Sequence, residues 1–250
     1  MNFEEVGVRA DRNFDNFMIG ESNKEAYQTA FDCAAQFGEQ YNRLWIYSEN
    51  GLGGSHLLHA IGNELLGLQP NIRIKQIHTE RFVNSYRQAN FQNEMAKFQE
   101  SYREPNCLLL DDMQYLLCSC SEHTDIQEEF IHILSTLFSG DVFLAFTADR
   151  PINELPKSNI KLLLNQCKQV TISLPEITLK RQLAKYFSLQ RGYELPDEIV
   201  SFISQQEAGN IRELEGQVNL MLCEIEETAE ALNLNFVKKF YLRWYERFYN

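Results

Sequence analysis

The stretch Ser48-Glu49-Asn50-Gly51-Leu52-Gly53-Gly54-Ser55-His56 lies between an apolar run, Leu44–Tyr47, and a helical pattern. A strand, a glycine-rich loop and a helix, in this order, surround the phosphate-binding motif G-x-x-x-x-G-K-[S/T]. Ser55 stands at the position of the hydroxyl that contacts magnesium, whereas Ser48 replaces the first glycine and Gly54 replaces the lysine. The stretch therefore predicts a phosphate-binding loop that lacks its central cation.

The 250-residue chain is acidic, with a net charge of −12 and a pI near 4.9. This charge argues against broad attraction to DNA phosphates, although it is compatible with a local basic face. No apolar run reaches the length of a membrane span, and residues 1–5 lack the basic and apolar regions of a signal peptide. We therefore expect a cytoplasmic protein whose six cysteines are reduced thiols.

Three residues of types that bind metals are close together in the sequence, namely Cys118, Cys120 and His123. They are compatible with a partial metal site or with a surface loop that carries chance cysteines. Because the fourth ligand and the usual spacing of a zinc site are absent, the surface loop is the favoured interpretation.

Strand-like runs alternate with helical patterns in the first 174 residues. The expected strands are 44–47, 72–77, 107–110, 142–147 and 170–174, and the expected helices are 25–37, 57–66, 80–89 and 126–138. This alternation predicts an α/β fold with a five-stranded parallel sheet and helices on both faces. Beyond Pro175 only helical patterns follow, near 179–191, 197–206, 210–227 and 236–249. We therefore expect an α/β core over residues 1–174 and a small all-α lid over residues 175–250.

Polar side chains follow two apolar strands. Asp111 and Asp112 come after Leu108–Leu110, where Asp111 would orient magnesium and Asp112 would polarise an attacking water. The alternative is a strand end with two solvated acids. The segment Thr147–Arg150 follows the next strand and offers a polar group that senses the γ-phosphate. Arg212 opens a lid helix and is either a nucleotide contact or a surface arginine.

Together these segments resemble the AAA+ domain of the bacterial replication initiator DnaA and of its shorter relative Hda. The matching segments are Asn13–Phe17 with Gly20, Ser22 and Asn23, Gly51–Gly53, Ser55–Ala60, His78–Phe82, Leu110–Asp112, Thr147–Arg150 and Asn210–Gly216. The resemblance covers roughly residues 13–240, and Arg191–Pro196 looks closer to Hda. It implies a P-loop AAA+ fold and a site for ATP or ADP with magnesium.

The resemblance also implies roles for single residues. The implied nucleotide-binding residues are Phe17, Asn23, Gly51, Gly53, Gly54, Ser55, His56, Asp149 as the first sensor and Arg212 as the second. The implied magnesium ligands are Ser55 and Asp111, and Asp111 and Asp112 are the remnant catalytic acids. The segment around Phe14–Asn23 would border the adenine. Alternative interpretations stay open for three side chains, since Phe14 and Phe17 also suit a core and His56 also suits simple packing.

Three departures from the family pattern weaken hydrolysis. Loss of the lysine at Gly54 removes a charge-assisted contact of about 1.5–3 kcal/mol, or roughly 10- to 100-fold in affinity. Ser48 would be strained by about 1–2 kcal/mol if its position required a positive φ. The positions of the arginine finger hold Asn159 and Leu163, and Lys161 is a poor substitute because it lacks the planar fork. We therefore expect no efficient ATPase.

Two further surfaces offer binding interpretations. Residues 88–103, with Lys97, Tyr102 and Arg103, occupy the place of the initiator helices that hold single-stranded DNA, but acids dilute their charge. The last helix spaces Phe236, Phe240, Trp244 and Phe248 four residues apart, which suits a lid core and, less directly, a docking surface. We expect no domain that reads double-stranded DNA, no membrane contact, and no sliding-clamp peptide in residues 1–12.

The leading hypothesis is a DnaA/Hda-like AAA+ protein that acts in or regulates replication initiation through contacts with the initiator or another replication protein. Self-association fits the AAA+ ancestry. The alternatives are a slow ATPase and a single-stranded DNA-binding accessory factor.

Overall fold

The computed structural model describes residues 7–37, 42–117, 124–155, 158–206, 209–228 and 230–248. Cys118, Cys120 and His123, the candidate partial metal site, lie outside these residues. The chain divides into two compact units, each with its own core. The first comprises residues 1–17 and 23–173, and the second comprises residues 18–22 and 174–250.

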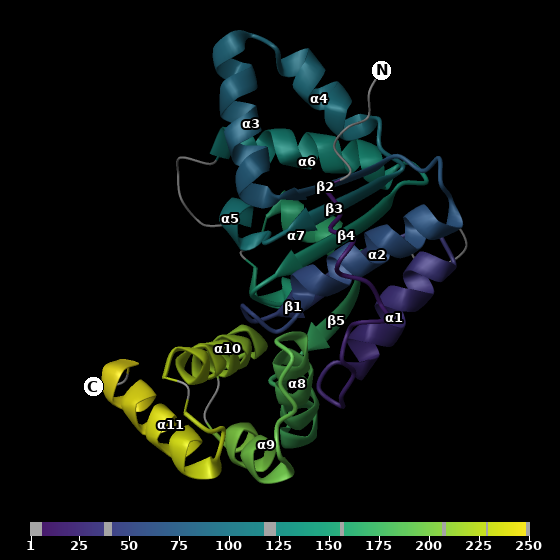
Figure 1. Ribbon diagram of the computed structural model, residues 1–250. Coiled ribbons are helices and arrows are strands. Elements are labelled where there is room, and N and C mark those ends of the chain that lie inside the picture. Colours follow the sequence, from purple (N-terminus) through teal and green to yellow (C-terminus); the bar gives the residue numbers. More distant parts are fainter. Residues whose placement is uncertain are drawn as a thin grey trace. The chain divides into compact units, whose positions relative to one another are not determined.

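A five-stranded parallel sheet forms the centre of the first unit, with the strand order β2-β3-β4-β1-β5 (Figure 1). The strands are β1 Arg43–Ser48, β2 Ile74–His78, β3 Cys107–Asp111, β4 Phe143–Ala148 and β5 Lys168–Ile172. All six residues of β4 are buried, as expected for a strand covered on both faces. The order places the carboxyl end of β4 between those of β1 and β3, and so brings three polar strand ends together.

Helices cover both faces of this sheet. They are α1 Lys24–Ala35, α2 Gly54–Leu68, α3 Thr79–Gln92, α4 Met95–Arg103, α5 Gln114–Leu117, α6 Thr124–Phe138 and α7 Asn159–Leu164, with a 3-10 turn at Ile152–Glu154. Side chains of α1 and α2 share one core with Leu44 and Ile46 of β1. The neighbouring residue Trp45 points to the opposite core, which α3, α4 and α6 complete. This alternation along one strand is the period-2 pattern of a sheet with two buried faces.

The expected fold class is confirmed, but some element bounds differ. The last strand was expected at 170–174, whereas β5 ends at Ile172 because its five residues pair with Leu44–Ser48 of β1. Leu174, which the apolar run had included, is 55% exposed. The pattern of apolar residues did not predict α4, α5 or α7, since each is nine residues or shorter and carries a weak periodic signal, although the resemblance implied helices over residues 88–103.

Four helices build the second unit, namely α8 Ile177–Gln190, α9 Asp197–Ser204, α10 Ile211–Thr228 and α11 Leu234–Phe248. Their apolar faces form a separate core. The segment Met18–Ser22 joins this unit, where the Glu176 carboxylate accepts hydrogen bonds from the backbone amides of Glu21 (3.0 Å) and Ser22 (3.3 Å). Within the described part of the chain, no helix combines the length and the apolar character that crossing a membrane requires.

The aromatic side chains of α11 fill the core of this unit. Phe236 and Phe240 are at most 6% exposed and Tyr241 is 1% exposed, while Trp244 and Tyr245 pack against them partly buried. Phe236, Phe240 and Trp244 therefore close the helical core, as the simpler interpretation of the aromatic spacing expects, while the side chain of Phe248 lies outside the described part of the chain.

Candidate phosphate-binding site

The loop between β1 and α2 has the backbone of an anion cradle. Gly51 and Gly53 have φ values of +80° and +110°, in the left-handed region that glycine adopts at little cost. The Gly53 carbonyl begins α2 by accepting from the amide of Leu57 at 3.0 Å. The first amides of α2 therefore remain free of intrahelical partners and, with the helix dipole, favour a bound anion.

Ser48 does not carry the backbone strain considered for it. It is the last residue of β1 and lies in register with Ile172 of β5. Among the described residues, only Asn93 and Asp112 are non-glycine residues with a positive φ. A serine at the loop entry is thus compatible with an extended backbone, and the expected cost of about 1–2 kcal/mol does not arise here.

Ser55 and Asp111 meet at the start of α2 and the end of β3. The Ser55 hydroxyl donates to Asp111 Oδ1 at 3.0 Å, and Thr147 Oγ1 at the end of β4 donates to the same oxygen at 2.5 Å. The backbone amide of Asp112 donates in turn to Thr147 Oγ1 at 2.9 Å. Thr147, 3% exposed, therefore connects the two strand ends. The sequence pointed to its segment but assigned the sensor role to Asp149.

Burial raises the pKa of the Asp111 carboxyl above its ordinary value. The hydrogen bond from Thr147 opposes this shift, and the neighbouring charge of Asp112 adds to it. The carboxylate of Asp111 is consequently costly to keep ionised, and a bound cation would offset that cost.

The side chain of Asp112 is held by two donors. His78 Nε2 lies 2.7 Å from Asp112 Oδ2, and Gln114 Nε2 donates to Oδ1 at 3.0 Å. His78 Nδ1 accepts from the amide of Glu80 at 3.3 Å, which leaves the proton on Nε2 to be donated to Asp112. Asp112 has a φ of +59°, which is uncommon for a residue other than glycine. His78 was not predicted as a site residue; its position at the end of a strand was the available signal.

The donor set at Ser55 and Asp111 fits magnesium. A hydroxyl and one carboxylate are hard oxygen donors, and Mg²⁺ is usually held by one or two carboxylates together with waters and substrate phosphates. Over the described ranges, no three His, Cys, Asp or Glu side chains are grouped so that they could hold a metal ion. These residues therefore suit an ion completed by nucleotide phosphates rather than an all-protein cage.

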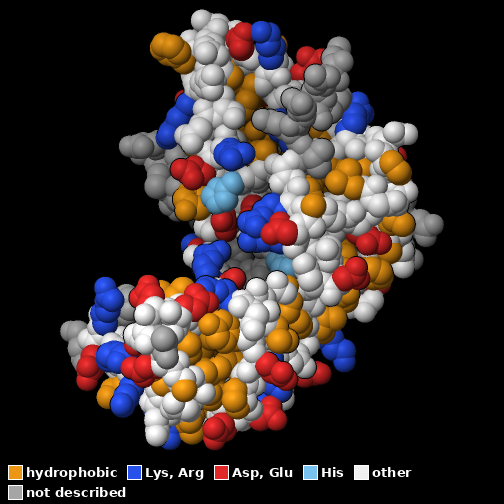
Figure 2. All heavy atoms as spheres, in the orientation of Figure 1, with side chains coloured by type: hydrophobic (Ala, Val, Ile, Leu, Met, Phe, Trp, Pro, Cys, Tyr) orange, Lys and Arg blue, Asp and Glu red, His pale blue; other side chains and the backbone are white. Residues whose placement is uncertain are grey.

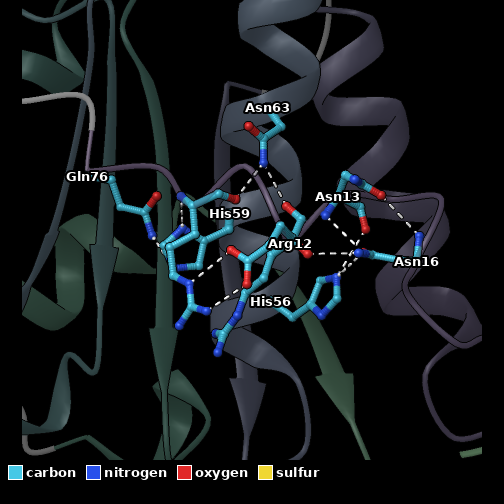
Figure 3. A network of polar contacts seen from close by, with 9 residues as sticks. Arg12, Asn13, Asn16, His56, His59, Asn63 and Gln76 are labelled. Carbon is cyan, nitrogen blue, oxygen red and sulfur yellow. Dashed lines mark hydrogen bonds and ion pairs between the residues drawn. The ribbon is translucent and has the colours of Figure 1, made fainter. Parts of the chain in front are cut away.

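Side chains of α2 form hydrogen bonds with the N-terminal segment, residues 9–16, as Figure 3 shows. Asn63 Nδ2 donates to the carbonyls of Arg9 (2.9 Å) and Arg12 (2.7 Å), and the Arg9 amide donates to His59 Nδ1 at 3.1 Å. His56 Nε2 lies 3.0 Å from both the Asn13 carbonyl and Asn16 Oδ1. Both partners of His56 are acceptors, so its Nε2 carries the proton.

His56 does not replace the missing cation. Burial lowers the pKa of His56, so the ring is neutral near pH 7, and its Nε2 is committed to the N-terminal segment. The Phe17 ring packs edge-on against His56 with centroids 5.2 Å apart. Phe14 and Phe17 are 5% and 8% exposed, within the core that α1 and α2 form, and Asn23 is 1% exposed at the start of α1. These three side chains are thus buried, and their place beside the adenine stays a prediction.

Two predicted sensor residues remain, Asp149 in the first unit and Arg212 in the second. Asp149 forms a two-pronged pair with Arg150, at 2.8 Å to Nε and 3.2 Å to Nη2. Arg212 belongs to the second unit and lies in the first turn of α10, which Asn210 Oδ1 caps by accepting from the amide of Glu213 at 2.8 Å. Their sensor roles stay predictions.

Lys161 on α7, the poor substitute for the arginine finger, forms hydrogen bonds within the first unit. Its Nζ donates to the carbonyls of Asn153 and Leu155, each at 2.7 Å. Leu162 beside it is 68% exposed. The surface of α7 therefore presents an apolar side chain next to an ammonium group that is already bonded.

The segment 88–103 is built as the helical pair α3 and α4. Tyr102, one of the residues named for single-stranded DNA binding, is 3% exposed, and Lys75 Nζ lies 3.9 Å from its ring centre. Lys97 pairs with Glu94, and Arg103 donates to His132. On the face that Figure 2 draws, acidic and basic side chains are interspersed over the visible part of this region and form no continuous basic patch. Phe91, 88% exposed, is the aromatic side chain that this region presents to solvent.

Comparison with known proteins agrees with this geometry. The family model described as the bacterial DnaA ATPase domain matches residues 8–169. Domain III of the replication initiation protein DnaA from Thermotoga maritima is similar, with a TM-score of 0.85, 27% identity, and coverage of 93% of this chain and 96% of that chain. AMPPCP-bound DnaA from Aquifex aeolicus has a TM-score of 0.76 and 25% identity, and covers 87% of this chain and 67% of that chain.

A third structure, of the replication initiator DnaA bound to AMPPCP and single-stranded DNA, has a TM-score of 0.75 and covers 89% of this chain and 69% of that chain. At 24% identity it supports the fold alone.

Proposed function

The chain belongs to the bacterial DnaA ATPase-domain family, and we propose that it acts in replication initiation through contact with the initiator, without efficient ATP hydrolysis. One observation carries the proposal: the site keeps the Ser55–Asp111–Thr147 network, while Gly54 stands where the loop lysine belongs. The elements that recognise magnesium and phosphate are thus retained, and the group that neutralises the transferring phosphoryl is lost.

Weak nucleotide binding is supported by the loop geometry. Two left-handed glycines and the amides of α2 still form an anion cradle, and the related protein from Aquifex aeolicus was captured with AMPPCP. The missing ammonium removes about 1.5–3 kcal/mol of that affinity. The loss in the transition state is larger, because charge on the transferred group must be stabilised there.

The same reasoning applies to the site of a neighbouring subunit. A chain whose finger positions hold Asn159 and Leu163 offers no guanidinium there, and Lys161 is bonded to two carbonyls of its own unit. Such a subunit shares the shape of the initiator but does not complete a neighbour's catalytic site. It therefore caps an ATP-dependent initiator filament or serves it as a scaffold.

The direct test is association with the DnaA-type initiator of the same cell, measured by light scattering with ATP and with ADP. The proposal expects a complex of defined size and a change in the length of initiator filaments. A mixture whose scattering equals the sum of its components in both nucleotides would refute it. The variant Leu162→Ala, measured in the same way, tests whether the apolar surface of α7 contributes to this association.

A slow ATPase is the second candidate, and the retained network around Asp111 favours it. Release of phosphate at millimolar ATP with magnesium, abolished by Asp111→Ala, would support this activity. Equal release by both proteins would exclude it.

A further inference from the structure

The two unusual residues of the loop lie against each other. Ser48 ends β1 and is 9% exposed, and Gly54 is the first residue of α2. A Cβ atom built on Gly54 would lie 2.5 Å from Ser48 Oγ and 3.6 Å from Ser48 Cβ. Non-bonded carbon and oxygen atoms do not approach to 2.5 Å, so a side chain at position 54 requires the Ser48 hydroxyl to rotate out of its present position.

Thr147 of the neighbouring strand β4 borders the same space. The same Cβ position lies 3.7 Å from Cγ2 of Thr147, which is an ordinary contact. Thr147 is fixed there by its bonds to Asp111 and to the amide of Asp112. The first part of a lysine stem at position 54 would therefore enter a gap between β1 and β4 that the Ser48 hydroxyl already occupies.

We propose that Ser48 and Gly54 are a single adaptation, in which the Ser48 hydroxyl fills the space that the root of the loop lysine needs. Serine at the first motif position then opposes lysine at the seventh, because the hydroxyl must move before the lysine stem can enter, and glycine at position 48 removes that cost. The loop is set for a Mg²⁺-bound nucleotide whose phosphate charge is met by the metal ion and by backbone amides. This assignment of the ligand rests on the proposed function, whereas the coupling between the two residues does not.

The test is a double-mutant cycle read by thermal unfolding of the full chain, without nucleotide. The four proteins are the natural chain, Ser48→Gly, Gly54→Lys and the double variant. We expect Gly54→Lys to lower Tm by about 2–10 °C, the cost of overpacking a filled site. In the Ser48→Gly background the same substitution should lower Tm by less than half as much. An equal loss in both backgrounds would overturn the proposal.

Two further variants test whether the coupling is specific to position 54 and whether it can be measured if Gly54→Lys does not fold. Gly54→Ala adds only the Cβ atom, so it shows the same coupling if Gly54→Lys does not fold. Gly67→Lys is the matched control, because Gly67 also lies in α2 and a Cβ there would meet no atom within 4 Å. Its effect on Tm should be the same with serine or glycine at position 48. A coupling as large at Gly67 as at Gly54 would refute the local explanation.

Affinity for Mg-ADP, measured on the same four proteins, separates this proposal from the proposed function. We expect the double variant to bind about 10-fold or more tightly than Gly54→Lys alone. Absence of ADP binding in every protein would contradict the nucleotide site, while the cycle in Tm would still decide whether the two residues are coupled.

Discussion

Removal of the Thr147 hydroxyl tests whether the strand ends are held together as the structure shows. Thr147→Val keeps the branched shape of this buried side chain but deletes one donor and one acceptor. The bond to Asp111 Oδ1, at 2.5 Å, reaches an acidic group, and the bond from the Asp112 amide, at 2.9 Å, is an ordinary amide–hydroxyl bond. Val cannot replace either.

The two losses have different sizes. A hydrogen bond to a charged group contributes about 1.5–3 kcal/mol, and a neutral one contributes about 0.5–1.5 kcal/mol. Since Asp111 is only partly buried, we expect a total loss of about 2–4 kcal/mol in the free energy of unfolding. For a chain of this size that corresponds to a decrease in Tm of roughly 5–15 °C.

Thermal and urea unfolding, followed by circular dichroism, would measure this effect. Thr171→Val is the matched control, because Thr171 lies on the neighbouring part of the sheet in β5 with an exposed side chain. It should change Tm by no more than about 2 °C. If Thr147→Val and Thr171→Val have the same Tm, the network does not stabilise the fold and the reasoning is refuted.

Three further predictions concern single side chains. Burial raises the pKa of Asp111, so the fold favours the protonated carboxyl. The stability that this protonated form contributes is complete at low pH and is lost as pH rises through the folded-state pKa. Asp111→Asn should therefore be more stable than the natural chain at pH 7, with a difference in Tm that shrinks on acidification; a difference independent of pH would contradict this. Burial lowers the pKa of His59 to about 4 from an ordinary value of 6.5, so its contribution is present above pH 6.5 and is lost as pH falls toward 4. The free energy of unfolding should drop by up to about 3 kcal/mol across that window, and His59→Gln should flatten the drop while His132→Gln, at an exposed position, leaves it unchanged. Lys161→Met should lower the free energy of unfolding by about 1–3 kcal/mol, because two carbonyls lose their donor, whereas Lys168→Met on exposed β5 should have no measurable effect.

The pattern of apolar residues predicted the fold because each strand is a short, continuous apolar run next to a turn signal. The runs 44–47 and 107–110 became β1 and β3 almost unchanged. The strand register then decided what the sequence left open. Parallel pairing set the end of β5, and the order β3-β4-β1 placed Thr147 between the ends of two neighbouring strands.

Parts of the site depend on contacts that spacing does not encode. The meeting of Ser55 with Asp111 was expected from the order of the motifs. The bond from His78 to Asp112, in contrast, joins two residues that are 34 positions apart in the chain, at the ends of β2 and β3. The hydrogen bonds from Lys161 Nζ to two backbone carbonyls depend on the 3-10 turn at Ile152–Glu154. The membership of Met18–Ser22 in the second unit depends on the carboxylate of Glu176, 154 residues from Ser22. Each arises from tertiary structure, which single-sequence patterns describe poorly.

Calorimetric titration of the full chain with ATP and with ADP, in the presence of magnesium, tests the central claim most directly when it is followed by a measurement of phosphate release. The account predicts weak binding, in the micromolar to millimolar range, and no release of phosphate above that of an Asp111→Ala control. Nanomolar binding, or phosphate release that depends on Asp111, would contradict it.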